Sequence, residues 1–295
     1  MKNILRLFIF LFLPLSSVTQ ADSLKVVASI KPIHSIVSFI MKGVGNPTLL
    51  IKGISSPHEY NLRASDAMIL ENADVVFWLG KGMESFLVKP LNSLKKNSII
   101  VTISDYQDLH RIKFYDNFHH NGGNQVYDLH LWLSPYNAKY IAHVIAMEMI
   151  KIDPKNKDIY EKNEEEFKSK LYKMDEEFHD ILRQVKGKNI IVFHDAYRYF
   201  ASYYDLHIVT FPMRHSIFMG AKSLQKVKDN IVLDKTSCIF YDPGFDPKII
   251  NYMTEGTGIK SAMLDPEGIL LAEGSDLYFQ LMNNISNSIA EKCIY

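Results

Sequence analysis

The chain has 295 residues, of which 47% are hydrophobic and 22% are charged. Its 33 basic and 33 acidic residues cancel, so no net charge draws it toward nucleic acid or anionic lipid. The length suffices for two domains with their own cores. Because no basic tract with interleaved aromatic residues occurs, we expect no nucleic-acid partner.

The first 21 residues have the parts of a secretory signal peptide. A basic start at Lys2 and Arg6 precedes an apolar run at residues 7–15, which is too short to span a bilayer. Thr19 and Ala21 stand at the −3 and −1 positions of a cleavage site. We therefore expect cleavage after Ala21 and export of the mature chain to the periplasm.

Strand and helix signals then alternate. Strands are predicted at residues 26–30, 48–51, 75–79 and 98–103. Helices are predicted at residues 33–42, 65–72 and 84–95. Strands separated by helices indicate βαβ units and a mostly parallel sheet.

Residues 104–128 interrupt this alternation. The segment is polar and contains Gly122-Gly123, so we expect a flexible surface loop. Its histidines are candidates for a second, weaker metal site: His110, His119 and His120. Ser134-Pro135 then begins a predicted helix that runs to residue 152.

A long helix is predicted at residues 158–185. Its apolar residues recur at gaps of three, four or seven positions and form one narrow stripe. They are Tyr160, Phe167, Leu171, Met174, Phe178, Ile181 and Val185. A helix of this length reaches about 42 Å and can connect two lobes. The alternative is that this helix forms one side of a coiled coil, which the short apolar stripe disfavours.

The alternation resumes after this helix. Strands are predicted at residues 189–193, 207–211, 237–241 and 262–264. Helices are predicted at residues 197–204, 221–232, 247–254 and 276–292. The sequence thus predicts two α/β lobes with mostly parallel sheets, at residues 22–156 and 187–295, joined by one long connecting helix at residues 157–186.

The chain has two cysteines, Cys238 and Cys293. An even count in an exported chain indicates a disulfide, which would close a loop of more than fifty residues. The alternative is two free thiols, one in a strand and one in the terminal helix.

Four polar residues stand where ligands bind in open α/β sheets, beyond the carboxyl ends of strands. His58, His194 and Asp265 follow predicted strands, and His130 precedes a predicted helix. Three imidazoles and one carboxylate make a suitable tetrahedral set for Zn²⁺, in the cleft between the lobes. Each residue also has a structural interpretation, since His130 lies among apolar residues and Asp265-Pro266 could open a turn.

Several motifs match one known family in combination and in order. They are Ser56-Pro57-His58-Glu59-Tyr60-Asn61-Leu62-Arg63, Asn72-Ala73-Asp74, His130-Leu131-Trp132-Leu133-Ser134-Pro135, Val192-Phe193-His194-Asp195-Ala196-Tyr197 and Leu264-Asp265-Pro266. Through them nearly the whole mature chain resembles the metal-binding receptors of ABC importers for zinc and manganese. It is most similar to the zinc-uptake, ZnuA-type members.

The resemblance implies two α/β lobes joined by one long helix, and a receptor that hands its metal to a membrane permease. It implies that His58, His130 and His194 bind the metal. The fourth position falls on Asp265, which is a ligand in some members and is replaced by water or another acid in others. The resemblance also pairs the two cysteines.

Zinc is the metal that this set of residues favours. Manganese-type members tend to carry a carboxylate where His194 stands, and imidazole suits Zn²⁺ better than Mn²⁺. Residues 212–218 depart from the usual family loop, and we expect His215 near the cleft as a group that supports the ligands.

Two alternatives remain beside a monomeric zinc receptor without enzymatic activity. One is a manganese-type receptor of the same family. The other is a periplasmic zinc hydrolase, because three histidines on zinc with an open position are also a catalytic pattern. A hydrolase would need a general base, yet Glu59 is the only adjacent acid in the first motif and no His-Glu-x-x-His helix occurs.

Overall fold

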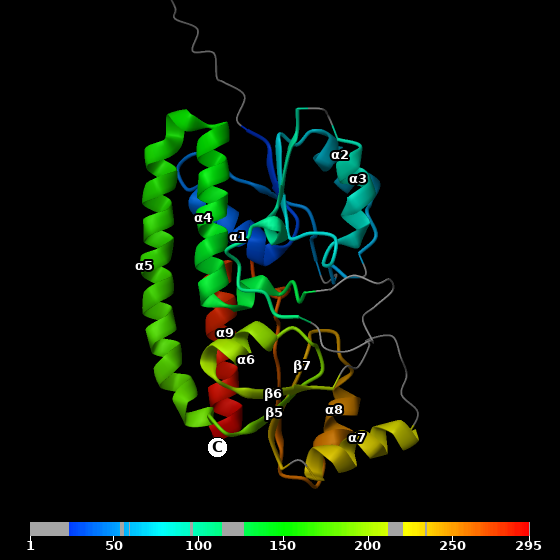
Figure 1. Cartoon of the computed structure of the whole chain (residues 1–295). Helices are drawn as coiled ribbons and strands as arrows, with labels where there is room; N and C mark the ends of the chain where they lie inside the picture. Colours follow the sequence, from blue (N-terminus) through cyan, green and yellow to red (C-terminus); the bar gives the residue numbers. More distant parts are fainter. Residues whose placement is uncertain are drawn as a thin grey trace, which may run out of the picture.

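The computed structural model of the chain describes residues 24–294 except 54–55, 59, 95–96, 114–126, 212–220 and 234. The expected signal peptide, Glu59, His119, His120 and His215 lie outside the described residues. Two four-stranded parallel sheets with flanking helices form the described part, and one long helix runs beside both (Figure 1). The predicted fold class is therefore confirmed.

The amino-terminal sheet has the strand order β2-β1-β3-β4. Its strands are β1 (Val26–Ala28), β2 (Thr48–Leu49), β3 (Val75–Trp78) and β4 (Ile99–Thr102). Residues of β1 and β3 are buried on both faces, as is typical of a parallel sheet between two layers of helices. Val26 and Val75 face the main core, which includes α1 (Lys31–Ile40), whereas Val27 and Val76 face a smaller cluster. The helices of that cluster are α2 (Ala64–Glu71), η1 (Ser85–Leu87) and α3 (Val88–Asn92).

The carboxyl-terminal sheet repeats this arrangement with the order β6-β5-β7-β8. Its strands are β5 (Asn189–Val192), β6 (His207–Thr210), β7 (Thr236–Tyr241) and β8 (Lys260–Met263). Ile190 and Val192 face the main core, while Ile191 and Phe193 face the other side. The helices of this lobe are α6 (Arg198–Tyr204), α7 (Ala221–Leu233), α8 (Pro247–Thr254) and α9 (Leu277–Ile294).

Helix α5 (Lys157–Leu182), extended by η6 (Arg183–Val185), connects the two lobes. It packs lengthwise against α4 (Pro135–Ile152), which η5 (Pro154–Asn156) joins to it, and against α9 (Figure 1). The ring of Phe167 lies 5.3 Å from that of Phe39 in α1 and 5.1 Å from that of Phe279 in α9. One core therefore runs through both lobes along α5.

The apolar stripe predicted for α5 is buried in the structure, except near its carboxyl-terminal end. Leu182 is buried, whereas Ile181 is only half-buried. Leu182 lies four positions after Phe178, so the α-helical spacing continues to the end of α5, and the 3₁₀ turn η6 begins only after it, at Arg183.

Cys238 in β7 and Cys293 in α9 form a disulfide across a sequence separation of 55 residues. The predicted bond is confirmed, and it ties the last helix to the centre of the carboxyl-terminal sheet. Among the helices of the described residues, none is long and apolar enough to cross a membrane.

Glu84 was predicted to begin a helix, but it lies before one and its side chain is fully buried. Its carboxylate accepts hydrogen bonds from the Ser29 hydroxyl at 2.5 Å and from the backbone N–H groups of Leu79 and Gly80 at 3.2 and 3.0 Å. Burial raises the pKa of Glu84 to about 7, although these hydrogen bonds oppose the rise. The carboxyl group thus binds the backbone N–H groups that directly follow β3 and does not cap an exposed helix.

Candidate metal centre

Three of the four predicted ligands meet at the boundary between the lobes. His58 lies in a turn after β2, His130 directly precedes η4 (Leu131–Leu133), and His194 follows the end of β5. One ligand nitrogen from each of the three rings lies within 4.8 Å of the other two. Tetrahedral zinc needs nitrogens about 3.3 Å apart, so a small inward movement of the rings would complete this part of a site.

The three rings differ in burial, which gives the cluster a closed side and an open side. His130 is 3% exposed, His194 is half-buried and His58 is exposed. The ring centroids of His130 and His194 lie 5.1 Å apart, and those of His58 lie 5.4 and 5.9 Å from them. We infer that an ion reaches the cluster from the side of His58.

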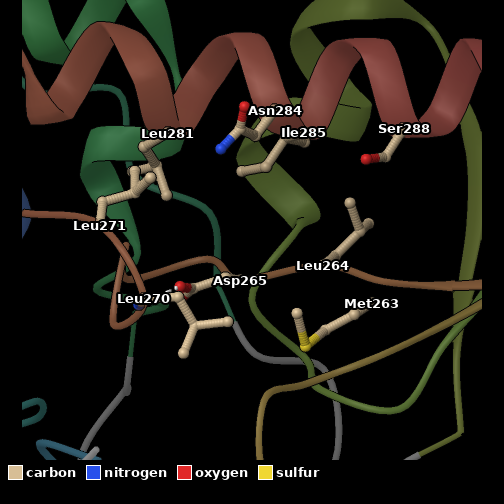
Figure 2. A pocket seen from close by; sticks show the side chains of 9 residues that line it. All are labelled: Met263, Leu264, Asp265, Leu270, Leu271, Leu281, Asn284, Ile285 and Ser288. Carbon is tan, nitrogen blue, oxygen red and sulfur yellow. Dashed lines mark hydrogen bonds between the residues drawn. The ribbon is translucent and has the colours of Figure 1, made fainter.

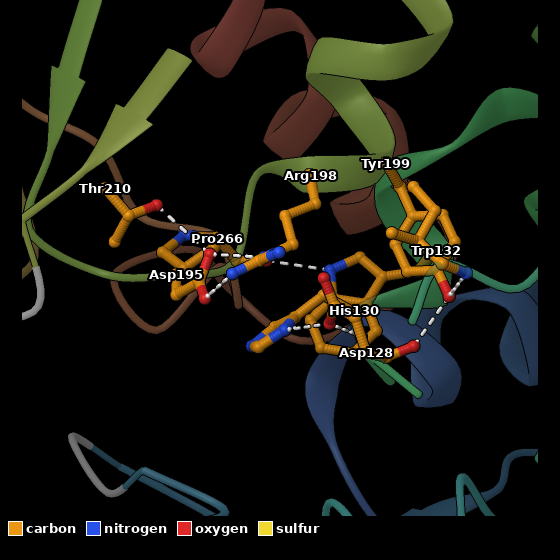
Figure 3. Close-up of polar contacts among 9 residues, drawn as sticks. Asp128, His130, Trp132, Asp195, Arg198, Tyr199, Thr210 and Pro266 are labelled. Atoms are coloured by element: carbon orange, nitrogen blue, oxygen red, sulfur yellow. Dashed lines mark hydrogen bonds and ion pairs between the residues drawn. The ribbon is translucent and has the colours of Figure 1, made fainter. Parts of the chain in front are cut away.

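The ring of His130 is fixed from behind by Asp128. One Asp128 oxygen lies 2.7 Å from His130 Nδ1 and also accepts the backbone N–H of His130 at 2.9 Å. The backbone carbonyl of Asp128 accepts a hydrogen bond of 2.6 Å from the Tyr199 hydroxyl of α6 (Figure 3). Nε2 of His130 is buried and has no hydrogen-bond partner in the described part of the chain, so its lone pair is available to an ion.

Asp242 holds the ring of His194 in the same manner. Its Oδ2 lies 2.6 Å from His194 Nδ1. Burial by itself would lower the pKa of His194, but the charges of Asp242, Glu267 and Asp128 outweigh it and raise the pKa to about 9. A carboxylate behind a histidine sets which ring nitrogen carries the proton and makes the other a better metal ligand.

Asp265 is not part of the cluster in which the ligand nitrogens of the three histidines lie within 4.8 Å of one another. Its two carboxylate oxygens accept backbone N–H groups within its own loop, Oδ1 from Glu267 at 3.2 Å and Oδ2 from Leu270 at 3.0 Å. The residue also lines a pocket of about 180 Å³ between β8, this loop and α9 (Figure 2). In the structure, Asp265 thus makes the contacts of a turn residue, which is the structural interpretation of Asp265-Pro266.

Glu267, two residues further on, is 6% exposed. Burial raises its pKa to about 8, and Asp242, Asp265 and Glu84 contribute to the rise while His194 opposes it. No role was predicted for Glu267 from the sequence.

Of the three histidines of the predicted second site, the structure describes His110, which is not part of the cluster of His58, His130 and His194. His110 is exposed, and its backbone exchanges hydrogen bonds of 2.9 Å with the side chain of Asn137. His119 and His120 lie outside the described residues.

Asp128 and Asp242 were also missed as functional residues, although the sequence carries a signal for each. Asp128 stands two positions before His130, within reach of the same ring. Asp242 directly follows β7, at the same edge of the sheet where His194 follows β5. Beyond the carboxyl ends of parallel strands, a carboxylate and an imidazole on neighbouring strands are expected to meet.

Two parallel α/β lobes joined by one helix, with three histidines meeting between them, define a two-lobed binding protein with an imidazole site able to hold a metal ion. The family described as zinc-uptake complex component A, periplasmic, has a model that matches residues 26–292. The high-affinity zinc uptake system protein ZnuA of Brucella abortus (strain 2308) is 35% identical over 330 aligned positions, which cover 99% of each chain. The corresponding protein of Yersinia pestis is 34% identical, with 90% of each chain covered.

A crystal structure of ZnuA has the same fold, with a TM-score of 0.78 at 24% identity, and the match covers 92% of this chain and 100% of that one. The chain belongs to the ZnuA family of zinc-uptake proteins.

Proposed function

We propose that the mature protein captures Zn²⁺ in the periplasm at His58, His130 and His194 and delivers it to the membrane permease of an ABC importer. The observation that carries the proposal is the cluster of three imidazoles with ligand nitrogens within 4.8 Å of one another. Membership of a family whose relatives are named as high-affinity zinc uptake proteins supports zinc as the cargo.

The chemistry of the ligands supports zinc over manganese. Neutral imidazole suits Zn²⁺, whereas Mn²⁺ favours carboxylate, carbonyl and water oxygens. The carboxylates behind His130 and His194 commit each Nδ1 to a hydrogen bond or ion pair and leave Nε2 for the ion. Three histidines leave the fourth tetrahedral position to a carboxylate or a water.

The remaining parts of the proposal rest on the sequence. Residues 1–21 would direct export and be removed, so that residues 22–156 and 187–295 form the lobes of a monomeric receptor with residues 157–186 between them. Binding rather than catalysis is the proposed role, and a second, weaker site at His110, His119 and His120 stays a prediction.

Competition between metals tests the proposed function. The mature protein should bind one Zn²⁺ tightly, and Zn²⁺ should displace Mn²⁺ but not the reverse. His194→Ala should weaken zinc binding by more than about 100-fold, since loss of a residue behind a ligand already costs 10–100-fold.

His207→Ala is the matched control, because His207 is exposed on the same sheet and its ring pairs with Asn189 at 2.9 Å. Displacement of zinc by manganese would assign the chain to the manganese-type receptors. Zinc-dependent hydrolysis of ester or peptide substrates by the wild-type protein, lost in His194→Ala, would favour the hydrolase.

A further inference from the structure

We propose that Lys31 is a positioning residue that fastens the loop of residues 265–271 in the carboxyl-terminal lobe to the amino-terminal lobe, and that this contact slows the release of the bound ion. The proposal rests on the proposed function in zinc capture. It deepens that function by naming a residue that controls how long the ion stays, although the residue is not itself a ligand.

The position of Lys31 at the start of α1 is not explained by its own helix. It is the first residue of that helix, whose first turn contains no acidic residue, and the helix dipole opposes a positive charge at this end. Side chains of a helix tilt toward its amino end, so the Lys31 ammonium projects away from α1. The contacts that it makes outside the helix therefore account for a lysine at this position.

The contacts of Lys31 lie in the other lobe. Its ammonium donates to the carbonyl oxygens of Gly268, Ile269 and Leu271 at 3.2, 2.7 and 2.8 Å. An ammonium group has three N–H donors, so these three oxygens use its whole capacity. Hydrogen bonds from a charged donor are stronger than those between neutral groups, and Lys31 is half-buried. The ammonium thus forms a strong contact between the lobes.

The backbone of the loop is shaped to present these oxygens. Gly268 has a φ of 68°, in the left-handed region, and its carbonyl accepts the backbone N–H of Leu271 at 3.0 Å. The Asp265 carboxylate accepts the backbone N–H groups of Glu267 and Leu270 at 3.2 and 3.0 Å. The loop is therefore held in a turn by its own bonds, and Lys31 binds a group of carbonyls that is already formed.

The same loop also contacts the segment that carries His130. The Trp132 indole N–H donates to the Pro266 carbonyl at 2.8 Å (Figure 3). The ring of Trp132 lies 5.3 Å from that of His130. The position of the loop therefore bears on the surroundings of one histidine of the amino-terminal lobe.

The three histidines are divided between the lobes that Lys31 connects. His58 and His130 belong to the amino-terminal lobe, whereas His194 follows β5 of the other lobe. Their ligand nitrogens lie within 4.8 Å of one another, and any separation of the lobes would lengthen these distances. Loss of one partner of a hydrogen-bonded charge acts mainly on the rate of dissociation. Lys31 should therefore affect the release of the ion more than its capture.

Release of zinc from the mature full-length protein tests the proposal. Stopped-flow mixing of the zinc-loaded protein with excess fluorescent chelator measures the release rate. Lys31→Met keeps the apolar stem but removes the donors, and should release zinc at least about tenfold faster than wild type. Lys31→Arg keeps the charge and has donors of its own, so it should release zinc more slowly than Lys31→Met.

Lys170→Met is the matched control for the loss of a lysine. The Lys170 ammonium contacts Asp276 at 2.7 Å, in the same connection between β8 and α9, but both side chains are exposed. Exposed ion pairs contribute little, so this variant should release zinc at the wild-type rate.

Hydrogen exchange of the metal-free protein tests the contact without zinc. The backbone N–H groups of Leu270 and Leu271 are hydrogen-bonded within the loop, so they should exchange slowly in wild type. In Lys31→Met they should exchange at least about tenfold faster, because local opening of the loop becomes easier. The backbone N–H groups of β5 should exchange at the same rate in both proteins.

A lower melting temperature of Lys31→Met, with unchanged zinc release and unchanged exchange at Leu270 and Leu271, would assign Lys31 a structural role only and overturn the proposal. Rapid exchange of these two N–H groups in the wild-type protein would also overturn it, because the loop would then not be held. Failure of the wild-type protein to bind zinc would instead refute the proposed function, and exchange in the metal-free protein would still decide whether Lys31 holds the loop.

Discussion

At the scale of single residues, two of the three clustered histidines have a carboxylate at the ring nitrogen Nδ1. Asp128 lies 2.7 Å from Nδ1 of His130, and Asp242 lies 2.6 Å from Nδ1 of His194. An imidazole that is free to rotate or to change tautomer presents its lone pair to the ion only part of the time. Each carboxylate removes that freedom, so part of the entropic cost of ordering the ligand is met during folding.

Replacing Asp242 with Asn should therefore weaken zinc binding without removing a ligand. We expect a loss of about 10–100-fold in affinity, measured by chelator competition. Asp246→Asn is the matched control, because Asp246 is four positions away and caps α8 through the N–H of Lys248 at 2.9 Å, a role that Asn fills equally well. Equal affinities for the two variants would show that the pair formed by Asp242 and His194 does not support metal binding.

Zinc binding should also depend on pH through His194. The surrounding carboxylates overcome the effect of burial and raise its pKa to about 9 in the metal-free protein. Zn²⁺ binds the neutral ring, so near neutral pH the ion must displace a proton. Affinity should rise with pH up to about 9 by as much as about tenfold per unit, and level off above that value.

Calorimetry in two buffers of different ionisation enthalpy would count the protons released near pH 7.5. One proton from His194 is expected. A binding enthalpy that is the same in both buffers, with an affinity that does not change between about pH 6.5 and 8.5, would contradict this assignment.

At the scale of elements, α5 derives its stability from the stripe of residues that it buries. Phe167 is fully buried and packs against Phe39 of one lobe and Phe279 of the other. Tyr172 lies on the same helix with 64% of its surface exposed. Replacing each of these two aromatic residues in turn therefore shows how much of the stability of α5 comes from burial and how much from helix propensity.

Phe167→Ala should lower the free energy of unfolding by about 3–5 kcal/mol, because it leaves a cavity in the core that both lobes share. Tyr172→Ala should change it by no more than about 0.5 kcal/mol. Denaturant titration of both variants measures the difference. Similar losses for the two would mean that the shared core along α5 does not hold the lobes together.

At the scale of the whole molecule, the connections between the lobes limit how far they can move. Helix α5 has no glycine or proline between Lys157 and Leu182, and kinks in helices usually occur at such residues. Lys31 and Trp132 of the amino-terminal lobe also bind the loop that carries Glu267. Both connections favour a site that closes by movements of side chains rather than of lobes.

Small-angle scattering should accordingly give nearly the same radius of gyration with and without zinc. Limited change is expected because α5 resists bending and the core is continuous across the lobes. A marked compaction on loading, as in receptors whose lobes close about a flexible hinge, would show that α5 is not a stiff connector.

The order and type of the elements could be predicted from the sequence because they depend on local patterns. Short β-branched runs between turn residues predicted the parallel strands, and the apolar periodicity of residues 158–185 predicted α5. His58 and His194 were predicted as ligands because they follow predicted parallel strands, at the edge of a sheet where ligands bind, and the family resemblance added His130. Two cysteines in a chain that was expected to be exported predicted the disulfide that the structure contains.

The residues that surround the site could not be predicted from the sequence, because their positions depend on contacts between residues far apart in the chain. Glu84 was predicted to begin a helix, yet its buried carboxylate accepts a hydrogen bond from Ser29, which lies 55 positions away. Lys31 and the carbonyl oxygens of residues 268–271 are more than 230 positions apart, and no local pattern links them. The sequence by itself determined which elements form and which imidazoles were candidates for the site. Only the tertiary structure decided which carboxylates stand behind and beside them, because burial and charge at a site are set by every segment that packs there.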